Sequence, residues 1–160
     1  MIRAVIIAAL CVALAGCGFT PLYGGGKLAP QMSSIYVEDI PERNGFELRT
    51  RLIEVLNTDG VLAGKRYRLK VSLNESSQGI ALQNDATITR YNNRMEAKYV
   101  LTDAGGTVVT QGTQSELSSY NVVQSPYATL AAEQDAGKRA AQDMAERIRL
   151  ELGVWFRKNR

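Results

Sequence analysis

Residues 66–74 alternate strictly between apolar and polar side chains. A period of two is typical of a β-strand with one buried and one exposed face. The apolar face of a sheet must be covered by a second layer, so this segment constrains the chain to a layered fold. The apolar members are Tyr67, Leu69, Val71 and Leu73, and the polar members are Arg66, Arg68, Lys70 and Ser72.

Further segments have strand character. Residues 34–37 predict a short strand, and residues 94–101 alternate in a similar way, although Val100 falls among their polar positions. Residues 87–91 predict a strand fragment. Asn92-Asn93 separates it from the next strand, and the apolar phase shifts after Ile88, so we predict a β-bulge there. The polar, glycine-containing residues 76–85 predict a loop or a frayed strand end.

Asp103-Ala104-Gly105-Gly106 predicts a hairpin turn, because its glycines supply the positive φ that such turns need. Residues 107–120 then return as an antiparallel strand. This strand is rich in Thr, Ser and Gln, so it buries little apolar surface. It faces either water or a polar partner.

Two segments have a helical period. The first is predicted to begin at an Asn44 cap with Glu47 three residues later, and to end at Asp59-Gly60. The second is long and begins at a Ser125 cap followed by Pro126. The buried stripe of the first is predicted to be Leu48, Leu52, Val55 and Leu56, and that of the second Leu130, Gly137, Ala141, Met144, Ile148, Leu152 and Trp155.

The predicted element order is β-α-β-β-β-α. We therefore expect an α+β fold, a two-layer sandwich in which two helices pack on one face of a mostly antiparallel four-stranded sheet.

The N-terminus carries the pattern of a bacterial lipoprotein signal. Arg3 precedes a short apolar run, and Leu14-Ala15-Gly16-Cys17 closes it with small residues before a cysteine. The run is too short to span a bilayer. We expect cleavage before Cys17 and lipidation of its thiol. The predicted domains are a signal peptide (1–16), a lipidated flexible tether (17–31) and a single folded domain (32–160).

Composition narrows the functions open to this domain. The chain has no histidine, which excludes the usual catalytic triads and histidine-based zinc sites. The acidic pairs Glu38-Asp39 and Glu133/Asp135 do not lie in a recognisable catalytic frame. We therefore predict a protein that is not an enzyme, with no catalytic residues, no bound metal and no cofactor besides the lipid on Cys17. A net charge of +3 is too small to indicate nucleic-acid binding.

Two motifs carry a resemblance to a known family. Cys17-Gly18-Phe19-Thr20-Pro21-Leu22-Tyr23-Gly24 follows the lipobox, and Ser125-Pro126-Tyr127-Ala128-Thr129-Leu130-Ala131-Ala132-Glu133 opens the last helix. With the element order, these resemble the lipopolysaccharide-assembly lipoproteins of the LptE family, in their alphaproteobacterial form. The resemblance covers nearly all of residues 17–160.

The resemblance implies a function that composition does not. LptE proteins are anchored by lipid in the inner leaflet of the outer membrane and face the periplasm. They plug the LptD β-barrel, help it to assemble, and bind lipopolysaccharide for insertion into the outer leaflet. The Ser/Thr/Gln-rich strand 107–120 suits the polar lumen of such a barrel.

Cations on the predicted strands are candidates for binding lipopolysaccharide phosphates, because guanidinium groups bind phosphate in bidentate fashion. The alternative is that these cations simply solvate the outer face of the sheet. The candidates are Arg66, Arg68, Lys70, Arg90, Arg94 and Lys98.

Other interpretations stay open. The chain could be a different lipoprotein binding module that regulates an envelope enzyme or transporter. Trp155 and Phe156 lie beside Arg157, Lys158 and Arg160, an aromatic and basic end that could touch a membrane or a partner. We favour the simpler interpretation of a last helical turn that packs Trp155 and leaves the charges in water.

Overall fold

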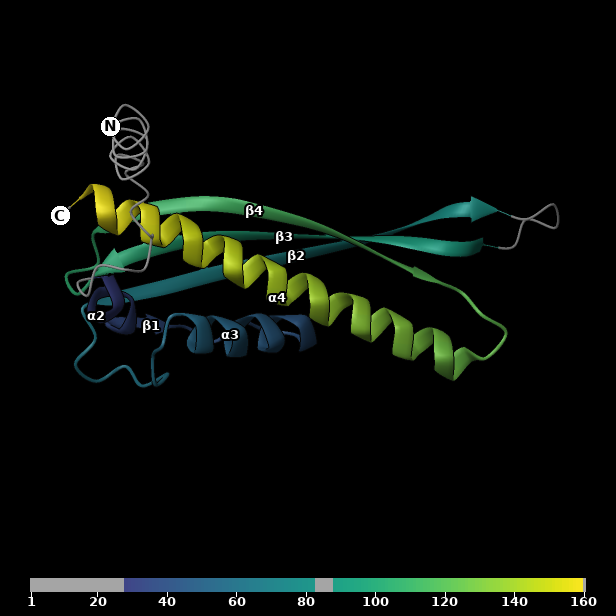
Figure 1. Cartoon of the computed structure of the whole chain (residues 1–160), viewed down its shortest axis with the longest axis horizontal. Coiled ribbons are helices and arrows are strands. Elements are labelled where there is room, and N and C mark those ends of the chain that lie inside the picture. The colour runs from purple at the N-terminus through teal and green to yellow at the C-terminus, as the bar shows by residue number, and fades with distance from the viewer. Residues whose placement is uncertain (1–27, 83–87, 160) are drawn as a thin grey trace, which may run out of the picture.

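The computed structural model describes residues 28–82 and 88–159. Two helices lie across one face of an elongated four-stranded sheet, which confirms the predicted α+β two-layer architecture (Figure 1). The strands stand in the order β1-β2-β3-β4. The elements are α2 (Leu28–Ser33), β1 (Ile35–Val37), α3 (Arg43–Val55), β2 (Tyr67–Leu82), β3 (Ile88–Asp103), β4 (Val108–Asn121) and α4 (Pro126–Lys158).

The sheet is mixed, although the rest of it is antiparallel as expected. β1 pairs with β2 in parallel, with Ile35 opposite Tyr67 and Val37 opposite Leu69. A parallel pair needs a crossover connection, and α3 supplies it while covering the sheet. The buried Ile35 and Val37 face this helical layer.

β2 and β3 form one long hairpin, which extends further than the sequence pattern indicates. Residues 76–82 continue β2, so the strand-end alternative holds there and the loop does not. The predicted bulge at Asn92-Asn93 was wrong, because β3 runs through these residues without a break. Ser77 pairs with Asn93 and Gln78 with Asn92, so cross-strand hydrogen bonds hold a segment of low strand propensity. The register shifts lie further out, between Gly79 and Leu82. The rest of the predicted loop, 83–85, lies outside the described residues.

The turn between β3 and β4 is confirmed at 103–106. One carboxylate oxygen of Asp103 accepts the backbone N–H groups of Gly105 and Thr107, each at 2.9 Å. Gly106 has a φ of 85°, a conformation that favours glycine. The chain then returns as β4, which forms one edge of the sheet.

α3 begins two residues earlier than predicted, and Asn44 is not its cap. The cap residue is Glu42, and its side chain makes no capping hydrogen bond. The Asn44 side chain instead donates a hydrogen bond of 2.8 Å to Glu75 on β2. Leu48 and Leu52 are buried as expected.

α4 begins as predicted, since the Ser125 hydroxyl accepts the backbone N–H of Ala128 and Pro126 opens the helix. The buried stripe holds from Gly137 to Leu152, but the prediction for Leu130 was wrong, because this side chain is 49% exposed. The first turns of α4 extend beyond α3 (Figure 1).

Residues 28–31, the end of the predicted tether 17–31, belong to the short helix α2. Met32 on α2 is 4% exposed, and its Cε lies 2.9 Å from where a Cβ on Gly153 of α4 would stand. The absence of a side chain at Gly153 thus lets α2 dock on the end of α4. Residues 1–27, including the signal and Cys17, lie outside the described residues.

A hydrogen bond ties the sheet to α4. Tyr99 on β3 is 4% exposed, and its hydroxyl donates to the Glu151 carboxylate. Burial, together with the hydrogen bond to Glu151, raises the pKa of Tyr99 above its usual 10.0. Above pH 10.0 the unfolded phenol ionises while the folded one does not, so this stabilisation is complete below that pH and lost as pH rises.

We therefore expect Tyr99→Phe to lower the free energy of unfolding by about 1 kcal/mol near pH 8, the usual contribution of one hydrogen bond. The difference from the parent should shrink when urea unfolding is repeated at about pH 11. A difference that is the same at both pH values would contradict this account.

Candidate functional site

The two faces of the sheet differ in chemistry. On β3, Met95, Ala97 and Leu101 are fully buried against the helices, while the residues between them point the other way. We call this second side the open face. Its cations, which come from neighbouring strands, are Arg68, Lys70, Arg90, Arg94 and Lys98.

The cations of the open face are only loosely paired. Lys98 lies 3.6 Å from Glu96, and Arg68 lies 3.8 Å from Glu38. Arg94 reaches the Ser115 hydroxyl at 3.4 Å. In the described part of the chain, no acidic group lies within ion-pair distance of Lys70. The open face therefore keeps an excess of positive charge that an anionic ligand could use.

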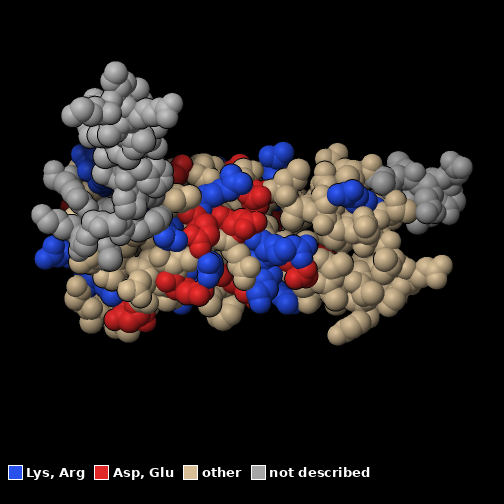
Figure 2. All heavy atoms as spheres, in the orientation of Figure 1, with Lys and Arg blue, Asp and Glu red and all other residues tan. Residues whose placement is uncertain are grey.

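The middle of the helical layer is different, because several of its cations are held in ion pairs with each other's partners. Arg51 on α3 bonds to Glu146 on α4 at 2.7 Å, and Arg149 bonds to the same carboxylate at 2.8 Å. In the face shown in Figure 2, positive and negative groups accordingly mix over the middle of the molecule. These ion pairs join the helices to each other and leave little charge for a ligand.

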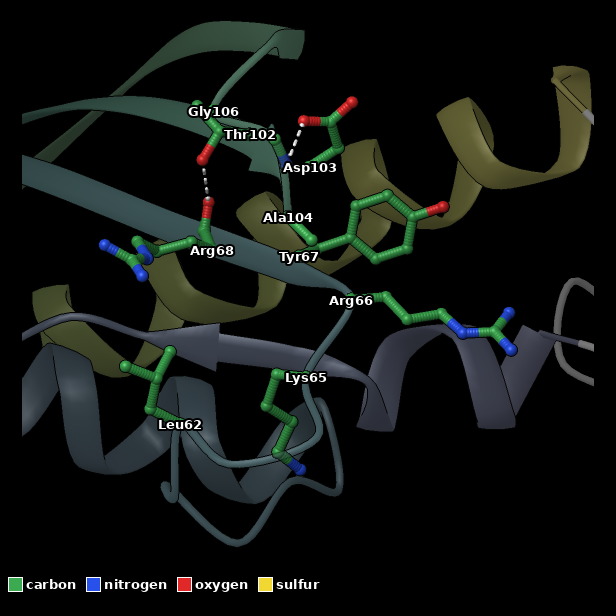
Figure 3. A pocket seen from close by; sticks show the side chains of 10 residues that line it. Leu62, Lys65, Arg66, Tyr67, Arg68, Thr102, Asp103, Ala104 and Gly106 are labelled. Atoms are coloured by element: carbon green, nitrogen blue, oxygen red, sulfur yellow. Dashed lines mark hydrogen bonds between the residues drawn. The ribbon is translucent and has the colours of Figure 1, made fainter.

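Arg66 does not share the open face with the other five cations. It precedes β2, and its side chain extends away from the end of the sheet (Figure 3). There it lines a hollow of about 460 Å³. The other lining residues are Leu62, Lys65, Tyr67, Arg68 and 102–106.

The opposite end of the molecule has almost no charge. Residues 76–82, 88–93 and 117–132, which we call the distal end, contain Arg90 as their sole charged residue. The corresponding right-hand part of Figure 2 is mostly tan. The large apolar side chains exposed here are Ile80 (48%), Leu117 (53%), Val123 (50%), Tyr127 (81%) and Leu130 (49%). Such a surface is better suited to contact with a partner than to exposure to water.

The face of β3 and β4 that lies toward α4 carries polar side chains near the distal end. Glu116 on β4 meets Arg147 on α4 at 3.0 Å, and Asn93 is buried at 8% exposure. Tyr91 and Tyr120 stack with their ring centroids 5.6 Å apart. Burial, and then the nearby Glu133, raises the pKa of Tyr120. The Ser/Thr/Gln-rich strand therefore turns alternate residues toward α4 and toward solvent.

The acidic pairs considered for catalysis lie in surface ion pairs. Asp39 meets Arg49 at 3.1 Å, and Asp135 pairs with Arg139 one turn further along α4. No group of three or more metal-ligating residues lies together within 28–82 and 88–159. Over those same residues, no helix has the length and apolarity of a membrane span.

The chain is similar in sequence to known proteins. A family model described as LptE, lipopolysaccharide-assembly, matches residues 32–152. Protein RP188 of Rickettsia prowazekii (strain Madrid E) is 25% identical over 149 residues, which cover 92% of this chain and 93% of that protein.

Solved structures agree with the family match. A crystal structure from Caulobacter crescentus CB15, of a protein classed as a lipoprotein, has a TM-score of 0.69 at 30% identity and covers 83% of this chain and 97% of its own. Rare lipoprotein B of Shewanella oneidensis shares the fold with a TM-score of 0.58 at 13% identity, over 75% of this chain and 92% of its own. The match over residues 32–152 places this chain in the LptE family of lipopolysaccharide-assembly proteins.

Proposed function

We propose that this protein is an outer-membrane lipoprotein subunit of the lipopolysaccharide assembly complex. In this proposal the lipid on Cys17 holds it to the inner leaflet, and the folded domain plugs an LptD-like β-barrel and helps it to assemble. The role is structural and involves no catalysis. The family match over residues 32–152 is the observation that carries the proposal.

The distal end supports the role of plug. A barrel lumen is polar and offers side chains on every strand, so a plug needs a surface that packs against them without burying unpaired charges. The distal end is long and nearly uncharged, and it carries exposed Leu117 and Tyr127 among Ser, Thr and Gln. We assign the barrel contact to this end.

The open face supports lipopolysaccharide binding. Its cations stand on paired strands, where Arg68 lies opposite Thr102 and Lys98 lies opposite Ser72. Neighbouring strands are about 4.8 Å apart and alternate residues about 6.6 Å apart, so the cations form an array that can meet several phosphates at once. Guanidinium groups would bind phosphate oxygens in pairs, and Lys70 would add a mobile charge.

Affinity purification of the tagged, lipidated protein from detergent-solubilised outer membrane tests the proposal. We expect a stoichiometric β-barrel partner, identified by mass spectrometry. Leu130→Arg should reduce recovery of the barrel, because it places a charge on the distal end. Leu150→Arg is the matched control, because Leu150 is similarly exposed (44%) on the helical layer. Recovery of the protein alone, or with a soluble envelope enzyme, would support the alternative of a regulatory lipoprotein module.

A further inference from the structure

The end opposite the distal end presents an apolar loop to solvent. We call this end the base; it comprises α2, the α3–β2 connection 56–66, the turn 104–107 and the last turn of α4 (Figure 1). Val61 is 53% exposed and Leu62 is 47% exposed at the tip of the connection. Gly60 and Gly64 flank the tip with φ values of 72° and 76°. Exposed neighbouring apolar residues on a tight loop need an explanation.

The loop is braced in this position. Lys65, whose side chain is only 11% exposed, bonds to Asp59 and to the backbone carbonyl of Ser33, each at 2.8 Å. Asp59 also accepts the backbone N–H of Val61 at 3.0 Å. Polar groups on both sides of the tip are thus used to hold it, and the apolar side chains stay outside.

The base also carries basic side chains. Arg66 extends from the end of the sheet beside the hollow, where it is exposed (Figure 3). Arg157 and Lys158 are exposed in the last turn of α4. The nearby acidic groups are engaged, since Asp59 pairs with Lys65 and Asp103 accepts backbone N–H groups of its own turn. Apolar side chains beside free cations are the chemistry that binds an anionic membrane surface.

The short segment between Cys17 and α2 also limits how far the base can lie from the membrane. If Cys17 carries lipid, only residues 18–27 separate it from α2, a reach of at most roughly 40 Å when fully extended. α2 is fixed to α4 through Met32 and Gly153, so the base is the end of the domain that is tied most closely to the membrane.

We propose that the base is a membrane-docking surface. Before the protein joins its barrel, Val61 and Leu62 enter the interface of the anionic phospholipid leaflet that holds the Cys17 lipid, while Arg66, Arg157 and Lys158 meet lipid phosphates. Docking holds the long axis of the sheet away from the leaflet and leaves the open face and the distal end free. This inference rests on the proposed lipid anchor but not on the barrel partner.

Vesicle binding by the unlipidated mature chain, residues 17–160 with Cys17→Ala, tests the docking. We expect it to sediment with vesicles of phosphatidylethanolamine and phosphatidylglycerol and not with phosphatidylcholine vesicles, and to be released by high salt. Leu62→Asp and Arg66→Glu should each weaken binding about fivefold. The matched controls are Leu130→Asp, at 49% exposure, and Lys138→Glu, and neither should change binding.

A second measurement locates the contact. The Cys17→Ala mature chain has no cysteine, so Leu62→Cys can be labelled alone with an environment-sensitive dye. Its emission should shift to the blue on addition of the phosphatidylglycerol vesicles, and a label at Leu130→Cys should not respond. Absence of vesicle binding, an equal loss in the controls, or an unshifted label at residue 62 would overturn the docking surface. None of these outcomes depends on recovery of the barrel.

Discussion

Replacing Leu152 by Ala should lower the free energy of unfolding by ~2–5 kcal/mol. Leu152 is fully buried on α4, in one cluster with Ile148 and Leu101. Its truncation removes apolar contacts and leaves a cavity in a close-packed interior, where neighbours relax only in part. Urea unfolding followed by circular dichroism measures the change.

The matched control lies two residues away on the same helix. Leu150 is 44% exposed, so Leu150→Ala removes the same atoms from solvent instead of from the core. We expect a change within about 0.5 kcal/mol, because alanine is a good helix former and no cavity results. Equal losses in both variants would contradict the position of α4 on the sheet.

Local patterns in the sequence predicted most of the fold. Alternation at 66–74 and 94–101 located two strands and their buried faces, because a period of two follows directly from strand geometry. Ser125 and Pro126 marked the start of α4, because the cap is a local hydrogen bond. These features depend on neighbours in the chain.

Features that depend on distant partners were missed. Residues 76–82 have little strand propensity and form a strand because Asn92, Asn93 and Arg94 pair with them. The sequence pattern indicates Asn44 as a helix cap, but its side chain donates a hydrogen bond to Glu75 on β2 instead. Leu130 fits the stripe of α4, but its side chain is exposed, and periodicity alone cannot show where a covering layer ends.

The candidate site was predicted in part. Alternation in the sequence predicts that Arg68 and Lys70 share one face of their strand, and that Arg94 and Lys98 share one face of theirs. The pairing of β2 with β3 brings these two sets of side chains onto the same face of the sheet. Arg66 was grouped with them, but it lies before β2 and belongs to the base. The distal end was missed, although one signal was available: residues 76–82 and 88–93 contain a single charged residue.

Charge reversal on the open face should have the largest effect on ligand binding. We expect Arg68→Glu with Lys70→Glu to weaken binding of purified lipopolysaccharide at least about tenfold, since the loss of one charge-assisted hydrogen bond of ~1.5 kcal/mol already accounts for that factor. Both side chains are exposed, so the fold should survive with an unchanged circular dichroism spectrum.

The control is Arg43→Glu with Lys138→Glu, which reverses one arginine and one lysine that are exposed on the helical layer. Net charge falls equally in the two double variants, so a nonspecific electrostatic effect would weaken binding equally. A loss confined to the open-face variant identifies the array as the binding surface. Unchanged binding in that variant would mean that Arg68 and Lys70 only solvate the sheet and do not contact lipopolysaccharide.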